Sequence, residues 1–220
     1  KIENAVGMPI TRVKYEQSFE YLLLECPIER KENSLSVKQG GNSSNRYSWA
    51  GPKMRWCTNR LKDAPREKYL RELRKKYTLY QYVGLAADEG YRLKRKNNQR
   101  TECVHPLAEW GMTESDCLQY CRDCGFDWNG LYQHFRRVSC WLCPLQPLDE
   151  LRALWDHFPE LWEKLKKYES MTWRKYRSDY SVDELEIRFA FEKECLAQGL
   201  PIRNKAFFTA LKERLVNANE

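Results

Sequence analysis

The chain has 220 residues, of which 42% are hydrophobic and 13% aromatic, enough for the core of one large domain or of a domain with an appendage. Lysine and arginine outnumber aspartate and glutamate by 38 to 31, and the formal charge of +7 suits an anionic ligand such as a nucleotide and, less decisively, a nucleic acid. Nine cysteines, an odd number spread over a long chain, exclude a small secreted disulfide scaffold.

The sequence predicts neither a membrane span nor a secretion signal. No run of 18 apolar residues occurs, and "KIENAVGMPI" at the N-terminus has no apolar signal-peptide core. We therefore expect a protein of the reducing cytoplasm with no membrane partner.

The first quarter of the chain shows one helix end, one strand pattern, one helix and a long polar stretch. Gly7 is a helix stop after residues 1–6. Residues 9–15 have a strand pattern, and residues 16–25 have apolar side chains on one helical face. Residues 27–51 are polar and contain "QGGNSSN", which is typical of a loop.

The middle of the chain combines a basic helix with two strand patterns. Pro65 fits the first turn of a basic helix that reaches about residue 76. Residues 77–87, "YTLYQYVGLAA", predict a buried parallel strand, and residues 102–110 a shorter second strand. Thr113 is a helix cap for residues 114–124.

The C-terminal third predicts helices only. Pro147 and Pro159 each open a helix, and Ser181 with its downstream glutamate forms a capping box for a helix that Gly199 ends. Asn204 caps the last helix. Strands that alternate with helices, followed by a helical tail, predict an α/β fold: a parallel sheet flanked by helices with a C-terminal helical appendage.

The cysteine spacing indicates a metal site. Cys140 and Cys143 form one Cys-x-x-Cys pair, Cys121 and Cys124 form another, and 15 residues separate the pairs. Four thiolates at such a spacing suit zinc or an iron–sulfur cluster. The spacing leaves Cys117, Cys121 and Cys124 open as alternatives on one helix, with Cys57 in "MRWCTNRLK" as a further candidate.

Basic residues surround Cys57. Residues 53–76 contain ten basic and three acidic side chains, and the end of that run, residues 71–76, fits a solvated helix face. Arg55, Arg60 and Lys62 precede this helix and flank Cys57, and they are candidate phosphate ligands, because arginine gives two-point contacts and lysine a point charge.

Polar residues also follow the strand predicted over residues 77–87. Asp88, Glu89 and Arg92 lie in "GLAADEGYRLKRK", where ligands gather beyond the carboxyl ends of parallel strands, although an ordinary polar turn explains them equally well. The three histidines form no site by their spacing.

Together, "RWCTNRLK", "YVGLAADEGYRLKR", "EWGMTESDCLQYC" and "GFDWNGLYQHFRRVSCWLCPL" resemble the phosphoadenosine phosphosulfate reductase family, which belongs to the adenine-nucleotide α-hydrolase-like superfamily. The resemblance covers roughly residues 7–215 and implies a nucleotide, ATP or phosphoadenosine phosphosulfate, at the carboxyl ends of the strands. It implies residues 1–146 as a nucleotide-binding-like domain with the cysteine site, and residues 147–220 as the helical region.

The resemblance also implies roles for single residues. It assigns Cys57, Cys121, Cys140 and Cys143 to the metal, a [4Fe–4S] cluster in preference to zinc, and so favours Cys121 over Cys124. It assigns Arg55, Lys62, Asp88, Glu89 and Arg92 to the nucleotide or anion.

Two family features are missing from this chain. The Ser-Gly-Gly-x-Asp-Ser phosphate loop does not occur, so we expect the chain as given to bind ATP poorly. The C-terminal Glu-Cys-Gly-x-His segment is also missing, since the last cysteine, Cys195, lies in "FEKECLAQG" within a predicted helix.

The resemblance favours an enzyme of nucleotide-dependent sulfur transfer or adenylation, with an adenine nucleotide and a sulfur donor protein as partners. Sulfonucleotide reduction proper is one alternative. The other is a zinc-stabilised module that binds nucleic acid or protein.

Overall fold

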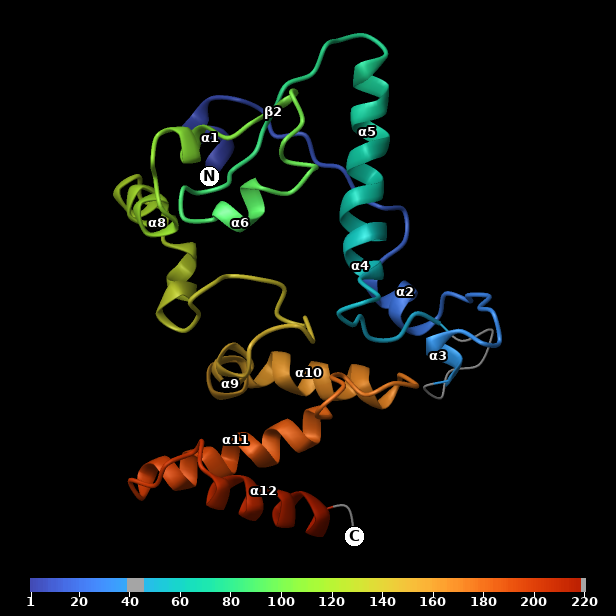
Figure 1. Ribbon diagram of the computed structural model, residues 1–220, viewed down its shortest axis with the longest axis vertical. Coiled ribbons are helices and arrows are strands. Elements are labelled where there is room, and N and C mark those ends of the chain that lie inside the picture. The colour runs from blue at the N-terminus through green and yellow to red at the C-terminus, as the bar shows by residue number, and fades with distance from the viewer. Residues whose placement is uncertain (39–45, 219–220) are drawn as a thin grey trace. The chain divides into compact units, whose positions relative to one another are not determined.

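The structure, a computed structural model, describes residues 1–38 and 46–218 (Figure 1). The chain divides into two compact units, each built from two stretches: Lys1–Val13 with Ala64–Gln133, here called unit 1, and Lys14–Asp63 with His134–Glu220, called unit 2. The predicted boundary between residues 146 and 147 lies within unit 2. Each compact unit therefore combines two stretches that are not consecutive in the sequence. The division into a nucleotide-binding-like domain, residues 1–146, and a helical region, residues 147–220, stays a prediction.

Unit 1 contains short helices and a two-stranded parallel sheet. Its elements are α1 (Ile2–Val6), α5 (Ala64–Arg74), β1 (Gln81–Tyr82), α6 (Gly90–Leu93), β2 (Cys103–Val104), α7 (Pro106–Glu109), α8 (Glu114–Asp123) and the 3₁₀ helix η2 (Trp128–Gln133). Gln81 pairs with Cys103 and Tyr82 with Val104. The Nζ of Lys1 donates to the carbonyl of Gly125 at 2.7 Å, which fastens the N-terminal stretch beside the end of α8.

The strands are shorter than the sequence predicts. Residues 9–15, which lie within the described part of the chain, form no strand. The strand predicted over residues 77–87 is reduced to Gln81–Tyr82, and the one over 102–110 to Cys103–Val104 followed by helix α7. The prediction of a fully buried strand is wrong, because Tyr80 and Tyr82 are 67% and 74% exposed. Apolar and branched residues favour a strand, but neighbouring strands must be present to bury both of its faces.

Unit 2 is helical. Its elements are α2 (Phe19–Leu24), α3 (Leu35–Lys38), α4 (Trp56–Thr58), the π-helix η1 (Asn59–Asp63), α9 (Leu148–His157), α10 (Pro159–Ser170), α11 (Val182–Ala197) and α12 (Lys205–Asn217). The loop predicted over residues 27–51 contains α3, and its segment "QGGNSSN" lies outside the described residues.

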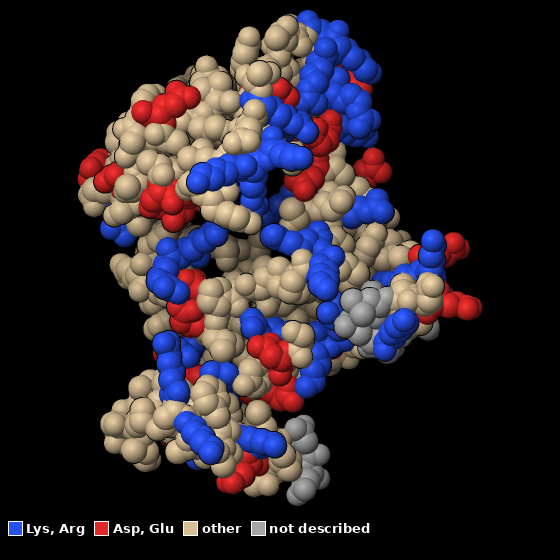
Figure 2. Space-filling model, in the orientation of Figure 1, with Lys and Arg blue, Asp and Glu red and all other residues tan. Residues whose placement is uncertain are grey.

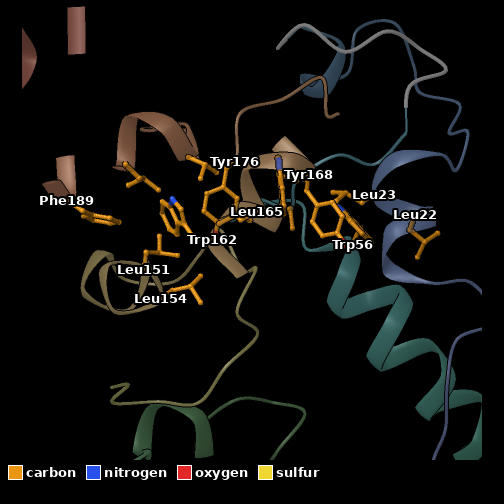
Figure 3. Close-up of a cluster of buried hydrophobic side chains, with 14 residues drawn as sticks. Leu22, Leu23, Trp56, Leu151, Leu154, Trp162, Leu165, Tyr168, Tyr176 and Phe189 are labelled. Atoms are coloured by element: carbon orange, nitrogen blue, oxygen red, sulfur yellow. The ribbon is translucent and has the colours of Figure 1, made fainter. Parts of the chain in front are cut away.

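The main core belongs to unit 2 (Figure 3). Leu151 and Leu154 of α9, and Trp162 and Leu165 of α10, are at most 1% exposed. The same cluster includes Leu22, Leu23, Trp49, Ala50, Trp56, Tyr168, Tyr176, Val182, Leu185 and Phe189. A second cluster joins α11 to α12 through Phe191, Cys195, Phe207 and Leu211.

Four of the predicted helix ends are confirmed by capping contacts, whereas the helix predicted over residues 16–25 is shorter, Phe19–Leu24. Thr113 and Ser181 each accept from the amide three residues on and form full capping boxes. The side chain of Asn204 accepts from the amide of Phe207 at 2.8 Å. Gly199 has a φ of 69°, which suits glycine after a helix end.

The described fold is thus largely helical with a small parallel sheet, and it is compatible with the predicted α/β class. The more specific sheet flanked by helices stays a proposal. In residues 1–38 and 46–218, the structure contains no helix whose length and apolar character would let it cross a membrane.

Candidate thiol and anion sites

Helix α4 places Cys57 through its buried neighbour Trp56. The Trp56 ring stacks on Phe19 and Tyr47, with centroids 5.5 and 4.9 Å away, and its Nε1 donates to the carbonyl of Ser48 at 2.9 Å. The chain continues directly into the π-helix η1, which carries Lys62. Single π turns are frequent at functional sites.

The Cys140–Cys143 segment is a tight turn held from both sides. The amide of Cys143 donates to the carbonyl of Cys140 at 3.0 Å. The side-chain amide of Gln146 donates to the same carbonyl at 2.7 Å and to Ser139 Oγ at 3.0 Å. These bonds fix the direction in which the two thiols leave the backbone.

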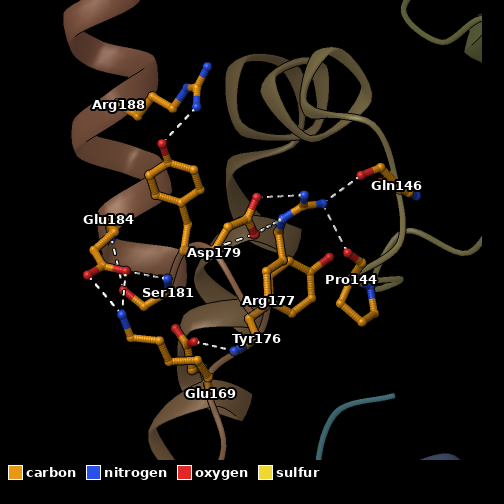
Figure 4. Close-up of polar contacts among 11 residues, drawn as sticks. Pro144, Gln146, Glu169, Tyr176, Arg177, Asp179, Ser181, Glu184 and Arg188 are labelled. Carbon is orange, nitrogen blue, oxygen red and sulfur yellow. Dashed lines mark hydrogen bonds and ion pairs between the residues drawn. The ribbon is translucent and has the colours of Figure 1, made fainter. Parts of the chain in front are cut away.

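Arg177 fastens the exit of this turn (Figure 4). Its guanidinium donates to the carbonyls of Pro144 and Gln146 at 3.0 and 2.8 Å, and it pairs with Asp179. The hydrogen bond to Asp179 raises the pKa of Arg177, and the same pair lowers the pKa of Asp179. Arg177 therefore acts as a permanently charged clamp on the turn after Cys143.

The two segments meet at Lys62, whose Nζ lies 3.7 Å from the Sγ of Cys140. Cys57 packs against the main core together with Trp141 and Leu142, the two residues between the paired cysteines. Burial raises the pKa of Cys143; the thiols of Cys140 and Cys57 raise it further, whereas Arg55 opposes them. Three thiols and two basic side chains thus lie in one region of unit 2.

The donor chemistry of this region suits a soft metal, because thiolates bind zinc and iron–sulfur clusters. Among the residues that the structure describes, however, no three His, Cys, Asp or Glu side chains have the arrangement of a metal site. Metal binding by Cys57, Cys140 and Cys143 therefore remains a proposal that rests on their gathering in unit 2.

Asp88, Glu89 and Arg92 lie together in unit 1, and each has a partner there. Asp88 accepts from the amide of Glu114 at 3.0 Å at the start of α8. Glu89 accepts from the amide of Ala86 at 3.2 Å and pairs with Arg92. These contacts shape the turn after β1, and the Arg92 side chain is 44% exposed.

Cys121 lies on helix α8, also in unit 1. Its thiol is close enough to Cys117 to raise the pKa of that residue, after the larger effect of burial and before those of Asp116 and Asp88. Cys124 is the exposed C-terminal cap of the same helix. Within unit 1, the thiol that lies near Cys121 is therefore that of Cys117. The other three predicted ligands, Cys57, Cys140 and Cys143, belong to unit 2.

The predicted residues accordingly fall into two groups. Arg55, Cys57, Lys62, Cys140 and Cys143 belong to unit 2, whereas Asp88, Glu89, Arg92 and Cys121 belong to unit 1. Whether Lys62 faces the same ligand as Arg92, and whether Cys121 completes the thiol group, stay predictions.

The sequence analysis missed two features of unit 2. His134 and His157 are separated by 22 residues, but their ring centroids lie 4.0 Å apart. A pocket of about 350 Å³ is lined by Gly51, Pro144, Gln146, Arg174, Arg177 and Asp179. No local pattern could reveal either one, since their residues come from separate segments.

The chain is similar to a protein of unknown role from an archaeon. Over 191 residues the chain is 26% identical to an uncharacterised protein of Methanocaldococcus jannaschii, with 83% of this chain and 34% of that protein covered. The chain thus spans about a third of the length of that relative, and the activity of the whole protein is a matter for proposal. No family model matches the chain, and no solved structure matches it.

Proposed function

We propose that the chain belongs to a nucleotide-dependent enzyme of sulfur transfer or adenylation, similar to the phosphoadenosine phosphosulfate reductases, with a cysteine-bound metal centre. The observation that supports it most is the 3.7 Å approach of Lys62 Nζ to Cys140 Sγ. It brings the segment of Cys57 beside the Cys140–Cys143 turn across 78 residues of sequence, in agreement with the motifs that carry the resemblance.

Cys57, Cys140 and Cys143 would hold the metal, with Cys121 as the fourth ligand. We favour a [4Fe–4S] cluster over zinc because the motifs resemble those of proteins with sulfur and redox chemistry. Such a group supplies electrons or binds a sulfur atom. Lys62 and Arg55 add positive charge, which offsets the charge of several thiolates and attracts an anionic substrate.

The nucleotide, ATP or phosphoadenosine phosphosulfate, would contact Asp88, Glu89 and Arg92. Lys62 and Arg92 would stabilise the negative charge that develops when the nucleotide phosphate is attacked in line. A sulfur donor protein would be the second partner. Sulfonucleotide reduction proper is less well supported, because Cys195, the last cysteine, is 6% exposed in the apolar cluster of α11 and α12.

The test is metal binding by the 220-residue chain under anaerobic conditions. We expect reconstitution with iron and sulfide to give the visible absorbance of a cluster, or zinc to bind at one ion per chain. Serine at Cys57, Cys140 or Cys143 should remove most of the bound metal, because serine lacks the soft thiolate ligand.

Cys26→Ser is the control, since Cys26 is not among the predicted ligands and its thiol donates to the carbonyl of Pro27 at 3.7 Å, so this variant should keep full occupancy. Comparing Cys121→Ser with Cys124→Ser identifies the fourth ligand. Full metal occupancy in all three variants of Cys57, Cys140 and Cys143, or no binding of iron or zinc by the unaltered chain, contradicts the proposed centre.

A further inference from the structure

The parallel pairing of β1 with β2 brings two basic stretches of unit 1 to one place. Parallel strands start at the same end, so the chain entering β1 and the chain entering β2 lie side by side. The amide of Gln81 donates to the carbonyl of Glu102 at 2.7 Å, which fixes that end of the pair. The entering segments are residues 75–80, which follow α5, and residues 94–101, which follow α6.

Both stretches are strongly basic. Residues 66–76 and 92–100 together contain eleven lysines and arginines but only two acidic residues, Glu67 and Glu72. Figure 2 shows such side chains gathered over α5. The sequence alone suggested a solvated helix face for residues 71–76, but it did not place the second stretch beside the first.

Most of this charge is not neutralised within the protein. Glu67 pairs with Arg66 and Arg74, Glu72 pairs with Lys75, and Glu89 pairs with Arg92. Six further exposed cations form no ion pair with a carboxylate among the described residues. They are Arg71, Lys76, Lys94, Arg95, Lys96 and Arg100.

Exposed tyrosines accompany these cations. Tyr77, Tyr80, Tyr82 and Tyr91 are 63%, 67%, 74% and 77% exposed. Tyr80 and Tyr82 are two residues apart in and beside β1, so their rings leave the same face of the strand. The guanidinium of Arg95 lies 4.9 Å from the ring centroid of Tyr91.

The combination of unpaired cations with exposed tyrosines favours a binding surface over a solvated face. Solvation explains exposed lysines and arginines, but it gives no reason for exposed aromatic rings beside them. Unpaired cations bind phosphates, and exposed aromatic rings stack on bases. Bases offer their faces when they are unstacked, which favours a single strand over a duplex.

We propose that residues 71–100 of unit 1 form a binding surface for single-stranded nucleic acid. The cations at the start of β1 and β2 contact the phosphates, and the exposed tyrosines stack on bases. The proposal goes beyond the metal centre and its chemistry, and it needs none of the cysteines.

The test is fluorescence anisotropy of labelled oligouridine and oligothymidine of about 20 nucleotides, long enough for the 4 to 16 nucleotides that such sites cover. The probes are titrated with the 220-residue chain at several salt concentrations. We expect binding that weakens with salt, and a salt slope smaller by about 2 in Lys94→Gln/Lys96→Gln/Arg100→Gln, since each single-strand phosphate contact contributes about 0.7.

The charge-matched control is Arg203→Gln/Lys205→Gln/Lys212→Gln, which removes three exposed cations from unit 2 and should leave affinity and slope unchanged. Tyr80→Leu/Tyr82→Leu keeps apolar side chains but loses the rings, and we expect an affinity about fivefold weaker or worse. Circular dichroism verifies that each variant is folded.

Three results overturn the proposal. They are equal losses in the two triple variants, tighter binding to a duplex of the same sequence than to the single strand, and binding to phosphatidylserine vesicles without binding to either oligonucleotide. These experiments do not measure metal content, so a negative result for nucleic-acid binding does not contradict the proposed metal centre. A chain that binds no metal likewise does not contradict the proposed nucleic-acid surface.

Discussion

At the scale of single residues, Glu169 is the carboxyl group whose environment most clearly links protonation to stability. Its two carboxylate oxygens accept from the amides of Tyr176 and Val182, each at 2.6 Å. Figure 4 draws the first of these bonds. These bonds tie the end of α10 to the segment that precedes α11. Burial nevertheless raises the pKa of Glu169, because its cost to the charged form exceeds the gain from the two donors.

A raised pKa in the folded state gives a definite pH dependence. The folded protein binds the Glu169 proton more tightly than the unfolded chain does, so this contribution to stability is complete below the ordinary value of 4.5. It is lost as the pH rises through the higher folded pKa. We expect the free energy of unfolding of the unaltered chain, minus that of Glu169→Gln, to fall over this window in urea titrations. A difference that rises with pH contradicts this assignment.

At the scale of elements, helices α9 and α11 are joined by a buried charge network. Glu192 of α11 is 1% exposed and accepts from Arg152 of α9 at 2.7 Å and from Arg188, one turn earlier on α11, at 2.8 Å. Arg188 also donates to the hydroxyl of Tyr180 at 2.9 Å (Figure 4). One carboxylate thus serves two guanidinium groups, and removing it leaves positive charge without a partner.

Glu192→Ala should therefore lower the free energy of unfolding by about 3–5 kcal/mol, the usual cost of breaking a buried pair. The ion pair between Lys193 and Asp156 joins the same two helices at the surface, with side chains 68% and 42% exposed. Lys193→Ala should cost no more than about 1 kcal/mol. Urea unfolding of the two variants measures both losses of stability. Equal losses would contradict the prediction that the buried Glu192 network contributes more to stability than the surface ion pair. Glu192→Gln, which keeps the volume, gives the comparison if the alanine variant does not fold.

At the scale of the whole molecule, the two units differ in the apolar surface that they bury. Unit 2 contains both hydrophobic clusters. Among the described residues of unit 1, the buried side chains are Pro65, Leu85 and Ala86. Since burial of apolar surface is the main favourable term in folding, unit 1 has the smaller reserve of stability.

We expect hydrogen exchange to separate the two units. Amides of α10 and α11 should exchange only through global unfolding, whereas those of α5 and α8 should exchange through local opening at a much lower free energy. Mass spectrometry of peptides from each helix measures this difference in the chain without metal. Equal protection of α8 and α10 would contradict it.

Local chemistry made the helices predictable. Thr113, Ser181 and Asn204 contact amides three residues on, and Gly199 supplies a left-handed conformation at one position. Each signal acts within one turn, so it operates wherever that stretch of chain lies. The strands failed for the opposite reason: residues 77–87 have the composition of a buried strand, but burial depends on neighbours that no local pattern contains.

By itself the sequence determined the helix ends, the Cys-x-x-Cys turn and the clustering of basic residues along the chain, because these depend on neighbours a few residues apart. Tertiary structure alone decided that Lys62 approaches Cys140, that His134 lies on His157, and that parallel pairing sets residues 94–101 beside residues 75–80. Such contacts join segments separated by about 20 to 80 residues. Closing loops of that length costs entropy, and the packing of the whole unit offsets this cost, whereas no local preference of the sequence does.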